Sequence, residues 1–314
     1  MEINDLIFKE LLKRGYSLEG NTRIWNIADS KLWYLTPEQA QAYLDLEQSE
    51  EYREYMFQTE INMLNKNMPE IIEKIAHGSA INIIDIGCGD GKKAVPVLDK
   101  LYGKMQLRYC PIDISSHMVR EAIKKIKKLG KGEVVEFSWN ISDFDNLENI
   151  SSLLREKEFR QNFFLFLGST IGNFEPHEVM YEIAEAMESD EDYLLMGLAL
   201  SNKMPKDILA SYKNDMNDKF LSLILLELGF ERDEIEFGAR YKNSRVELLY
   251  TIKKDKRLTL GEKSIDFVVG DQILVAVSYR HSEESLKTLL NAYFEDYKIF
   301  VNDDKSWALA LCKK

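Results

Sequence analysis

The segment from residue 81 to residue 93 constrains the fold of this chain more than any other. It begins with a run of apolar, β-favouring residues, continues with glycines that alternate with small or polar residues, and ends where a helix begins. A buried parallel strand that leads into a tight glycine turn is how α/β proteins let a ligand approach the backbone. Gly87, Gly89 and Gly91 remove Cβ atoms where a nucleotide would lie, and they permit positive φ. The segment therefore predicts a nucleotide-binding turn.

A second short strand supplies the acidic residue that such a ligand needs. The residues from Tyr109 to Ile112 predict a strand, and Asp113 follows its last residue. A carboxylate at the end of the second strand is placed to accept hydrogen bonds from both ribose hydroxyls of a nucleoside. The glycine turn and Asp113 together predict a nucleoside-containing cofactor on a Rossmann-like sheet. The alternative is a glycine-rich turn that binds no ligand.

The spacing of the glycines distinguishes between nucleotide-binding motifs. A phosphate-binding loop needs four residues between its glycines, then Lys and Ser or Thr, whereas three residues separate Gly87 from Gly91 and Lys93 follows Lys92. A dinucleotide motif needs a third glycine where this chain has Lys92, and a lysine there obstructs close packing of helix on strand. The sequence Asp-Ile-Gly-Cys-Gly-Asp-Gly at 85–91 instead resembles the first motif of S-adenosylmethionine-dependent methyltransferases.

The composition argues against several classes of function. The chain has 314 residues, of which 45% are hydrophobic, enough to build the core of one large or two modest domains. Its net charge of −12 argues against a nucleic-acid partner, which needs a basic surface. The basic residues between Arg120 and Lys131 are interpreted as the solvated face and end of a helix. No apolar run approaches the ~20 residues that span a bilayer, so no membrane association is expected.

The cysteines and the N-terminal residues bear on the cellular compartment. Cys88, Cys110 and Cys312 are scattered, without the spacing of a metal site or a disulfide framework. We interpret them as reduced thiols, which fits a cytoplasmic protein. The N-terminus has no basic segment followed by an apolar one, so no signal peptide is expected. The four histidines show no pairing that indicates a metal.

Alternating strand and helix patterns in the middle of the chain predict a parallel sheet with helices on both faces. The predicted strands are 81–86, 107–113, 133–138, 162–167 and 192–198, and the predicted helices are 60–76, 92–102, 115–129, 147–157 and 176–188. After a helical stretch at 206–228, the segments 235–241, 245–253, 256–260 and 264–269 predict an antiparallel meander. The chain closes with a predicted helix at 283–294 and strands at 297–302 and 307–312.

These patterns predict an α/β fold with two parts. A hairpin at the C-terminal end of an α/β sheet is the usual ending of the methyltransferase fold. We therefore expect a Rossmann-like methyltransferase sheet with a C-terminal antiparallel hairpin, formed by 62–198 and 279–314. Residues 1–61, which we expect to be mainly helical, and residues 199–278 would form a second α+β lobe that binds the substrate.

The predicted fourth strand continues into a long and specific motif, Leu-Gly-Ser-Thr-Ile-Gly-Asn at 167–173. This motif resembles that of the histidine-specific methyltransferase family, and the order of the other elements agrees over roughly residues 30–314. The resemblance implies an S-adenosyl-L-methionine-dependent enzyme that methylates a nitrogen atom. It also implies cofactor-binding roles for Gly87, Gly89, Lys93, Asp113, Ile114, Asp143, Phe144 and Gly168.

The chemistry of these side chains suggests how they would hold that cofactor. Asp113 takes the ribose hydroxyls, as its position after the second strand indicates. Asp143 can accept from the adenine amino group while Phe144 offers its backbone amide. Lys93 can pair with the methionine carboxylate. The alternative for Asp143 is a loop acid that binds no ligand.

In that family the amino-acid substrate is held by an Asn, by tyrosines, and by a Glu and a Ser. Asn173 matches the Asn, and a side-chain amide can both donate to a carboxylate and accept from an amine. An Asn that follows a glycine is also a common turn residue. Tyr212 matches the tyrosine of the second lobe, with a core aromatic as the alternative. Tyr52 best matches the N-terminal tyrosine, with Tyr55 as its rival.

This chain departs from the family where the Glu and the Ser are expected. Ser278 is kept, but Ala276 stands in place of the Glu. Losing one charged hydrogen bond to an imidazole costs roughly 1.5–3 kcal/mol, or about 10- to 200-fold in affinity. Ala276 also makes the pocket larger and less polar. We hypothesise that free histidine is not the preferred acceptor, and that a bulkier or less polar amine is, such as another aromatic amino acid or an indole derivative.

Four alternatives remain beside this hypothesis. The chain could methylate histidine itself, methylate a nitrogen of an unrelated small molecule, bind the cofactor in a regulatory role without catalysis, or methylate RNA, which its acidic charge disfavours. The attacking amine must be neutral, but no residue is assigned as a general base. Aromatic side chains in residues 1–61 could line a cage for a quaternary ammonium. We expect a monomer that acts on a small-molecule amine.

Overall fold

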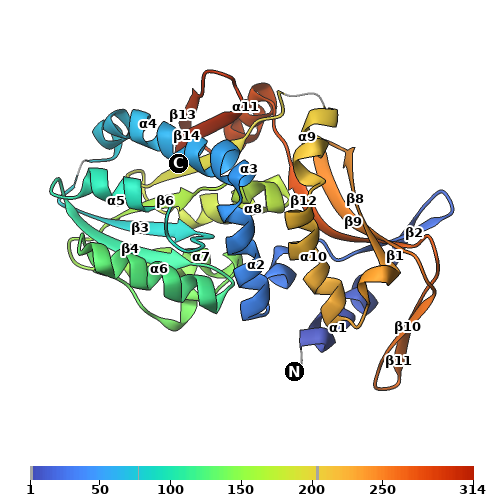
Figure 1. Cartoon of the computed structure of the whole chain (residues 1–314). Coiled ribbons are helices and arrows are strands. Elements are labelled where there is room, and N and C mark those ends of the chain that lie inside the picture. Colours follow the sequence, from blue (N-terminus) through green and yellow to red (C-terminus); the bar gives the residue numbers. More distant parts are fainter. Residues whose placement is uncertain (1–2, 77, 203–204) are drawn as a thin grey trace. The chain divides into compact units, whose positions relative to one another are not determined.

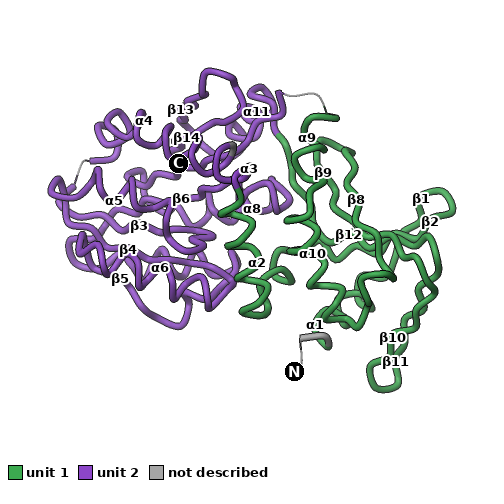
Figure 2. The backbone as a smooth tube through the Cα atoms, viewed as in Figure 1, with its two compact units in different colours: residues 1–49, 203–280 green, residues 50–202, 281–314 purple. Residues whose placement is uncertain are grey.

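A computed structural model describes residues 3–76, 78–202 and 205–314, and the chain divides into two compact units (Figure 2). Unit 1 comprises Met1–Ser49 and Lys203–Arg280, and unit 2 comprises Glu50–Asn202 and His281–Lys314. Residues 50–61 therefore fold with unit 2, which contains the larger sheet. The functional roles that the sequence suggests for the two parts stay predictions.

Unit 2 is built on a seven-stranded sheet with the order β13-β14-β7-β6-β3-β4-β5 (Figure 1). Its strands are β3 (Ala80–Ile86), β4 (Gln106–Ile112), β5 (Glu133–Val134), β6 (Gln161–Phe166), β7 (Tyr193–Ala199), β13 (Asp296–Val301) and β14 (Trp307–Lys313). The strands from β5 to β7 pair in parallel, whereas β14 is antiparallel to both β7 and β13. The predicted Rossmann-like sheet with a C-terminal antiparallel hairpin is confirmed.

Helices cover both faces of this sheet (Figure 1). One apolar core lies under α4 (Thr59–Ile75), α5 (Val95–Leu101) and α6 (Ser116–Leu129), and a second lies under α7 (Leu147–Leu154), α8 (Pro176–Ala186) and α11 (Glu283–Asn291). Every residue of β3, β6 and β7 is buried, as expected for parallel strands packed on both faces. The short helix α3 (Glu50–Tyr52) and the π-helical turn η2 (Arg53–Gln58) precede α4.

Strand β5 is shorter than the predicted strand 133–138. Its ladder with β4 stops at the pair Tyr109–Val134. Pro111 has no N–H with which to continue a ladder, and its carbonyl accepts a hydrogen bond from the Asn140 side chain at 2.7 Å. The chain forms the 3₁₀ turn η3 (Ser138–Asn140) there, and only then does Ile141 pair with Asp113.

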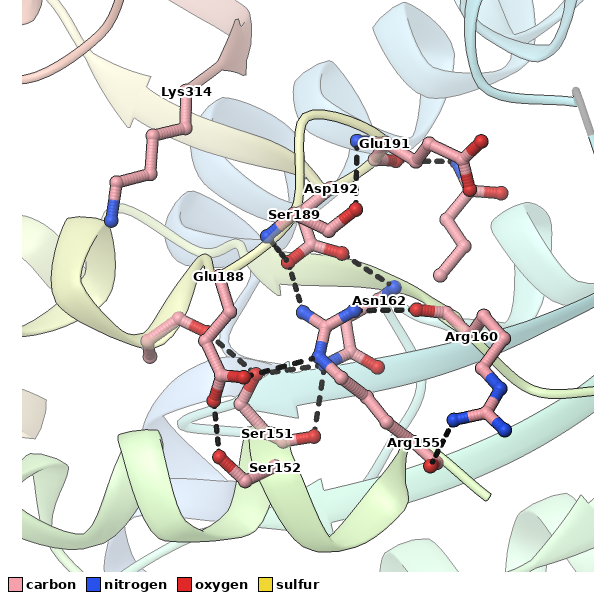
Figure 3. A network of polar contacts seen from close by, with 12 residues as sticks. Ser151, Ser152, Arg155, Arg160, Asn162, Glu188, Ser189, Glu191, Asp192 and Lys314 are labelled. Carbon is pink, nitrogen blue, oxygen red and sulfur yellow. Dashed lines mark hydrogen bonds and ion pairs between the residues drawn. The ribbon is translucent and has the colours of Figure 1, made fainter. Parts of the chain in front are cut away.

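A buried polar network lies where β6 and β7 begin (Figure 3). The fully buried Asp192 carboxylate pairs with Arg155 and accepts from the backbone amides of Asn162 (2.9 Å) and Ser189 (3.2 Å). Burial raises the pKa of Asp192, and the Arg155 hydrogen bond opposes that rise. The side-chain amide of Asn162 donates to Ser151 Oγ at 2.8 Å. This network occupies the amino-terminal edge of the sheet, whereas α/β sheets bind ligands at the carboxyl-terminal edge.

Unit 1 contains a five-stranded sheet with the order β1-β2-β12-β9-β8. Its strands are β1 (Tyr16–Glu19), β2 (Thr22–Asn26), β8 (Ile235–Lys242), β9 (Arg245–Ile252) and β12 (Gln272–Tyr279), and β10 (Lys256–Leu260) and β11 (Lys263–Phe267) form a separate ribbon. Its helices are α1 (Ile3–Arg14), α2 (Pro37–Gln48), α9 (Pro205–Tyr212) and α10 (Asp215–Glu227). No helix in the described parts of either unit is long and apolar enough to cross a bilayer.

The structure differs from the prediction in two places that involve unit 1. The described residues up to 61 are mainly helical, as expected, but β1 and β2 form an additional hairpin that was not predicted, and its second strand pairs in parallel with β12, at Trp25 and Ile273 for example. The predicted meander ends after β9, which pairs with β8 and with β12 rather than with β10. Strand β12 escaped prediction because Ile273–Val277 is continuously buried and lacks the alternation of a half-exposed strand.

Candidate cofactor and substrate sites

Three neighbouring strands of unit 2 end at the predicted cofactor residues. Strand β3 leads into Gly87, and β4, which pairs with it, leads into Asp113. On the other side of β3, strand β6 leads through Leu167 into Gly168. The backbone amides of Gly87 and Cys88 both donate to the Ile112 carbonyl, at 2.8 and 3.1 Å, and so tie the glycine turn to β4. The sheet therefore gathers these residues along its carboxyl-terminal edge.

Asp113 organises the glycine turn. Its Oδ2 accepts from the Gly89 amide at 3.1 Å and its Oδ1 from the Ser115 amide at 2.9 Å. Burial raises the pKa of Asp113, and hydrogen bonds from the Ser115, Gly89 and Ile114 amides oppose this rise. The side chain is half-buried, so solvent or a ligand can reach it. A half-exposed carboxylate at the end of the second strand fits the ribose role predicted for it.

The predicted adenine-binding pair lies alongside Asp113. The Ser142 amide donates to the Asp113 carbonyl at 3.1 Å, which carries the chain directly into Asp143. The ring of Phe144 packs edge-on against Phe166 and Phe174, with centroid distances of 5.7 and 4.7 Å. These contacts place the backbone of the pair next to the end of β4, so the residues present fit an adenosine-containing cofactor.

The three glycines of the turn differ in what surrounds them. A Cβ on Gly87 would lie 3.0 Å from Thr170 Cγ2, and one on Gly91 would lie 3.1 Å from Ala122 Cα. Packing within the protein thus already requires glycine at these two positions. A Cβ on Gly89 would meet no atom within 4 Å, although its φ of +51° favours glycine. Open space therefore faces the turn at Gly89, where a cofactor can approach the backbone.

A buried charged cluster lies between β3, α4 and the loop after β6. Both oxygens of the fully buried Glu60 accept from the Gly168 amide, at 2.8 and 3.0 Å. A Cβ on Gly168 would overlap the Lys93 ammonium, and a Cβ on Gly197 would overlap the Glu60 carboxylate. Lys93, which the resemblance assigns to the methionine carboxylate, therefore lies against the Gly168 loop.

Glu60 was not among the residues predicted for the site. Helical spacing gives a signal that could have found it, because Glu60 shares the buried face of α4 with Met63, Leu64 and Met68. A carboxylate on the apolar face of an amphipathic helix needs buried partners. The Gly168 amide is one such partner.

The Gly168 loop carries Asn173 in a strained turn. Ser169 has a positive φ of 59°, which is uncommon outside glycine and occurs at functional sites. Its amide donates to the Gly197 carbonyl at 2.9 Å, and its hydroxyl accepts from the Ala199 amide at 3.2 Å. The turn η5 (Thr170–Asn173) follows, and it leaves the Asn173 side chain half-buried. Strand β7 and Glu60 thus hold the backbone that presents Asn173.

Asp85, a buried residue of β3 in this cluster, should make the stability of the protein depend on pH. Burial raises its pKa to about 7, the Tyr109 hydroxyl opposes this by donating to Asp85 Oδ2 at 2.6 Å, and Asp113 adds to the rise. The folded protein therefore binds more protons than the unfolded chain between about pH 4 and pH 7. We expect its free energy of unfolding to fall over that range, by up to about 4 kcal/mol from this group, and to stay level above it.

The Asp85→Asn variant isolates this effect. An Asn cannot ionise, so urea denaturation should show the variant gaining stability relative to the natural chain as the pH rises from about 4 to about 7. The exposed Asp145, replaced by Asn, is the control and should show no such trend. A constant difference between Asp85→Asn and the natural chain across this range would contradict the raised pKa.

Unit 1 brings two of the predicted substrate residues together. The Tyr212 hydroxyl, at the end of α9, donates to Ser278 Oγ on β12 at 2.8 Å. Arg280 donates from Nη2 to the Tyr212 hydroxyl. Ala276 is buried, and because side chains alternate along a strand it lies on the same face of β12 as Ser278. The position of the missing Glu therefore faces the side on which Ser278 meets Tyr212.

The remaining predicted substrate residues belong to unit 2, as Asn173 does. Tyr52 ends α3 with its side chain half-buried. Tyr55 lies in the π-helical turn η2, but its side chain is outside the described residues. Such turns are rare and often occur at functional sites.

The described residues hold no candidate metal centre. Within these residues, which exclude the side chains of Glu2, Glu51 and His77, no group of three or more His, Cys, Asp or Glu side chains lies close enough together to bind an ion. The cysteines are buried and free, and burial raises the pKa of each thiol. Buried thiols of raised pKa are unreactive.

The fold and the edge of the sheet define the class of this protein. A Rossmann-like sheet with a C-terminal hairpin, a glycine turn after β3 and an acid after β4 form the framework of an S-adenosylmethionine-dependent methyltransferase. Residues 38–314 match the family described as "Histidine-specific methyltransferase, SAM-dependent", and the chain belongs to this family. Its cofactor is S-adenosylmethionine.

Two relatives are similar to this chain at low identity. The histidine N-alpha-methyltransferase of Mycobacterium tuberculosis is 25% identical over 229 residues, which cover 68% of each chain. The N-methyltransferase imqF of Aspergillus flavus is 23% identical over 258 residues, which cover 77% of this chain and 68% of the relative.

Among solved structures, an S-adenosylmethionine-dependent methyltransferase from Clostridium acetobutylicum is 14% identical with a TM-score of 0.41. The match covers 80% of this chain and 91% of that one. A likeness this distant adds nothing to the assignment, which follows from the family match.

Proposed function

We propose that this enzyme methylates the α-amino nitrogen of an amino acid or amino-acid derivative, and that free histidine is not its preferred acceptor. Transfer to nitrogen is supported by the names of both relatives, which are N-methyltransferases. Transfer to an α-amino group is supported by the name of the mycobacterial relative. The acidic chain, with its net charge of −12, does not favour a nucleic-acid acceptor.

The residues of the chain supply binding and orientation for this reaction. The bound cofactor supplies a sulfonium methyl group, which is transferred as the N–C bond forms and the S–C bond breaks. Asp113 and the pair Asp143–Phe144 hold the nucleoside in this proposal, and Lys93 holds the methionine carboxylate. Asn173, Tyr212 and Ser278 orient the acceptor, because amide and hydroxyl groups can both donate and accept. The amine must be neutral to attack, and its proton leaves to water.

The proposed change in acceptor specificity rests on Ala276. It is 3% exposed and shares one face of β12 with Ser278, which bonds Tyr212. A Glu at this position would carry its carboxylate toward that pair and could accept from an imidazole N–H. The methyl group of Ala276 offers no such partner. An acceptor whose side chain needs no carboxylate, such as an indole or a phenol, fits this face better.

The Ala276→Glu variant tests the specificity directly. We expect it to gain affinity for L-histidine by about 10- to 200-fold, the value of one charged hydrogen bond. Calorimetric titration of L-histidine, L-tryptophan and L-tyrosine into the protein with S-adenosylhomocysteine bound measures this, and a turnover assay follows for each ligand that binds. Ala276→Gln is the matched control, because it has the same shape without the charge and should gain much less.

The outcomes separate the proposal from its rivals. Tighter binding of L-tryptophan or L-tyrosine than of L-histidine to the natural chain supports it. Tight binding and efficient turnover of L-histidine would show that another group replaces the Glu, and the altered specificity would be refuted. Cofactor binding with no methylation of any amino acid or derivative would favour a regulatory protein instead.

A further inference from the structure

Arg280 is a buried arginine that pairs with no carboxylate among the residues whose side chains the structure describes. It ends the polypeptide segment of unit 1 that contains β12, and its side chain is only 9% exposed. Its Nη2 donates to the Tyr212 hydroxyl, and the guanidinium carbon lies 5.3 Å from the centre of the Tyr212 ring. Its Nε is buried and has no hydrogen-bond partner among the described residues. The positive charge is thus removed from water and held by Tyr212, and no carboxylate in the described part of the chain neutralises it.

The other arginines of unit 1 all form ion pairs. Each of them forms an ion pair with a carboxylate of the same unit: Arg14 with Glu10, Arg23 with Asp271, Arg232 with Asp218, Arg240 and Arg245 with Glu247, and Arg257 with Asp266. Among the described residues of this acidic chain, Arg280 has no such pair although it is the most buried of the set. Scarcity of carboxylates therefore does not explain its isolation.

Burying a charged group raises the free energy of the folded state unless the charge is paired. A buried arginine without an ion pair is therefore suited to bind an anionic group of a ligand. The planar guanidinium presents N–H groups in a fork that matches the two oxygens of a carboxylate. Arg280 also contacts Tyr212, which bonds Ser278, and both hydroxyls are predicted to hold the acceptor. The unpaired charge therefore lies within the candidate acceptor site.

We propose that Arg280 binds the carboxylate of the methyl acceptor, so that the substrates of this enzyme are amines that carry a free carboxylate. This inference rests on the proposed function, because it adds a recognition group to the same site. Ala276 removes a contact to one particular side chain, whereas Arg280 recognises a group common to amino acids. The two residues together select an amino acid with a free carboxylate and tolerate a large apolar side chain.

Matched acid and amide ligands test this role. L-tryptophan and L-tryptophanamide, and L-histidine and L-histidinamide, are titrated by calorimetry into the full chain with S-adenosylhomocysteine bound. In the natural chain the acid of the preferred pair should bind better than its amide. Arg280→Gln should weaken binding of that acid by about 10- to 100-fold and change binding of its amide by less than about threefold. Arg280→Lys should recover part of the loss.

Arg245→Gln is the matched control, because Arg245 also stacks on a tyrosine of this sheet but is paired with Glu247. It should leave the ratio of acid to amide affinity unchanged. Affinity for S-adenosylhomocysteine and the unfolding temperature of each variant are measured as well. A purely structural role for Arg280 would lower both ligand affinities together, along with the unfolding temperature.

The failures of the two proposals are distinguishable. If acid and amide bind the natural chain equally, or if Arg280→Gln weakens both equally, Arg280 does not recognise a carboxylate and the proposed N-methylation still stands. If the natural chain binds S-adenosylhomocysteine but neither member of either pair and no L-tyrosine, none of the amino acids considered under the proposed function is the acceptor. The proposed function and the role of Arg280 are then both refuted.

Discussion

Replacing Asp113 with Ala is expected to raise the dissociation constant for S-adenosylhomocysteine by at least about 100-fold. The carboxylate is predicted to accept from both ribose hydroxyls, and it already orients the amides of Gly89 and Ser115. Two charged hydrogen bonds at roughly 1.5–3 kcal/mol each amount to about 3–6 kcal/mol, or about 10²- to 10⁴-fold in affinity. Calorimetric titration of the cofactor product into the purified variant measures the loss.

Two further variants serve as a conservative replacement and as a surface control. Asp113→Asn keeps the shape and one acceptor, so its loss should be intermediate. Asp99→Ala, on the exposed side of α5 where Asp99 pairs with Lys131, should bind the cofactor product as the natural chain does. Unchanged affinity in Asp113→Ala, with a normal unfolding transition, would remove Asp113 from the cofactor site.

Replacing Glu60 with Ala is expected to lower the free energy of unfolding by about 3–5 kcal/mol. The change leaves the partly buried Gly168 amide without its acceptor and opens space beside Gly197, and breaking an interaction of a buried carboxylate has effects of about this size. Equilibrium denaturation in urea measures the loss. Because the same loop presents Asn173, the acceptor should also bind the variant more weakly.

Three further variants test this explanation, two in α4 and one in β7. Glu73→Ala changes an exposed carboxylate of α4 and should have little effect on stability. Glu60→Gln retains one acceptor oxygen for the Gly168 amide and should lose less than Glu60→Ala. Gly197→Ala should be destabilising as well, because its Cβ would overlap the Glu60 carboxylate. A stability loss of less than about 1 kcal/mol in Glu60→Ala would show that the amide finds another partner.

The sequence predicted the elements of unit 2 closely, since their signals are local. Strand β3 and helix α6 were expected at 81–86 and 115–129 and occur at Ala80–Ile86 and Ser116–Leu129. Apolar runs, helical periodicity and caps act between residues a few positions apart, so they can be recognised without the fold. Where local signals failed, as at β5 and β12, pairing with other segments decided the structure. Pro111 and Asn140 end the ladder between β4 and β5. In β12, continuous burial removes the alternation of apolar and polar residues by which a strand is recognised.

The same division holds for the candidate sites. By itself the sequence predicted a glycine turn and an acid as the binding residues for S-adenosylmethionine, and it singled out Tyr212 and Ser278, which the structure joins by a hydrogen bond. Only the tertiary structure decided that Glu60 holds the Gly168 amide, 108 positions away, and that Arg280 lies against Tyr212, 68 positions away, with no ion pair to a described residue. Helical spacing indicates that Glu60 is buried, but no local pattern predicts the partner of either residue, because a buried charge is defined by what the folded chain places around it. Its partners, or their absence, exist only once distant segments have packed together.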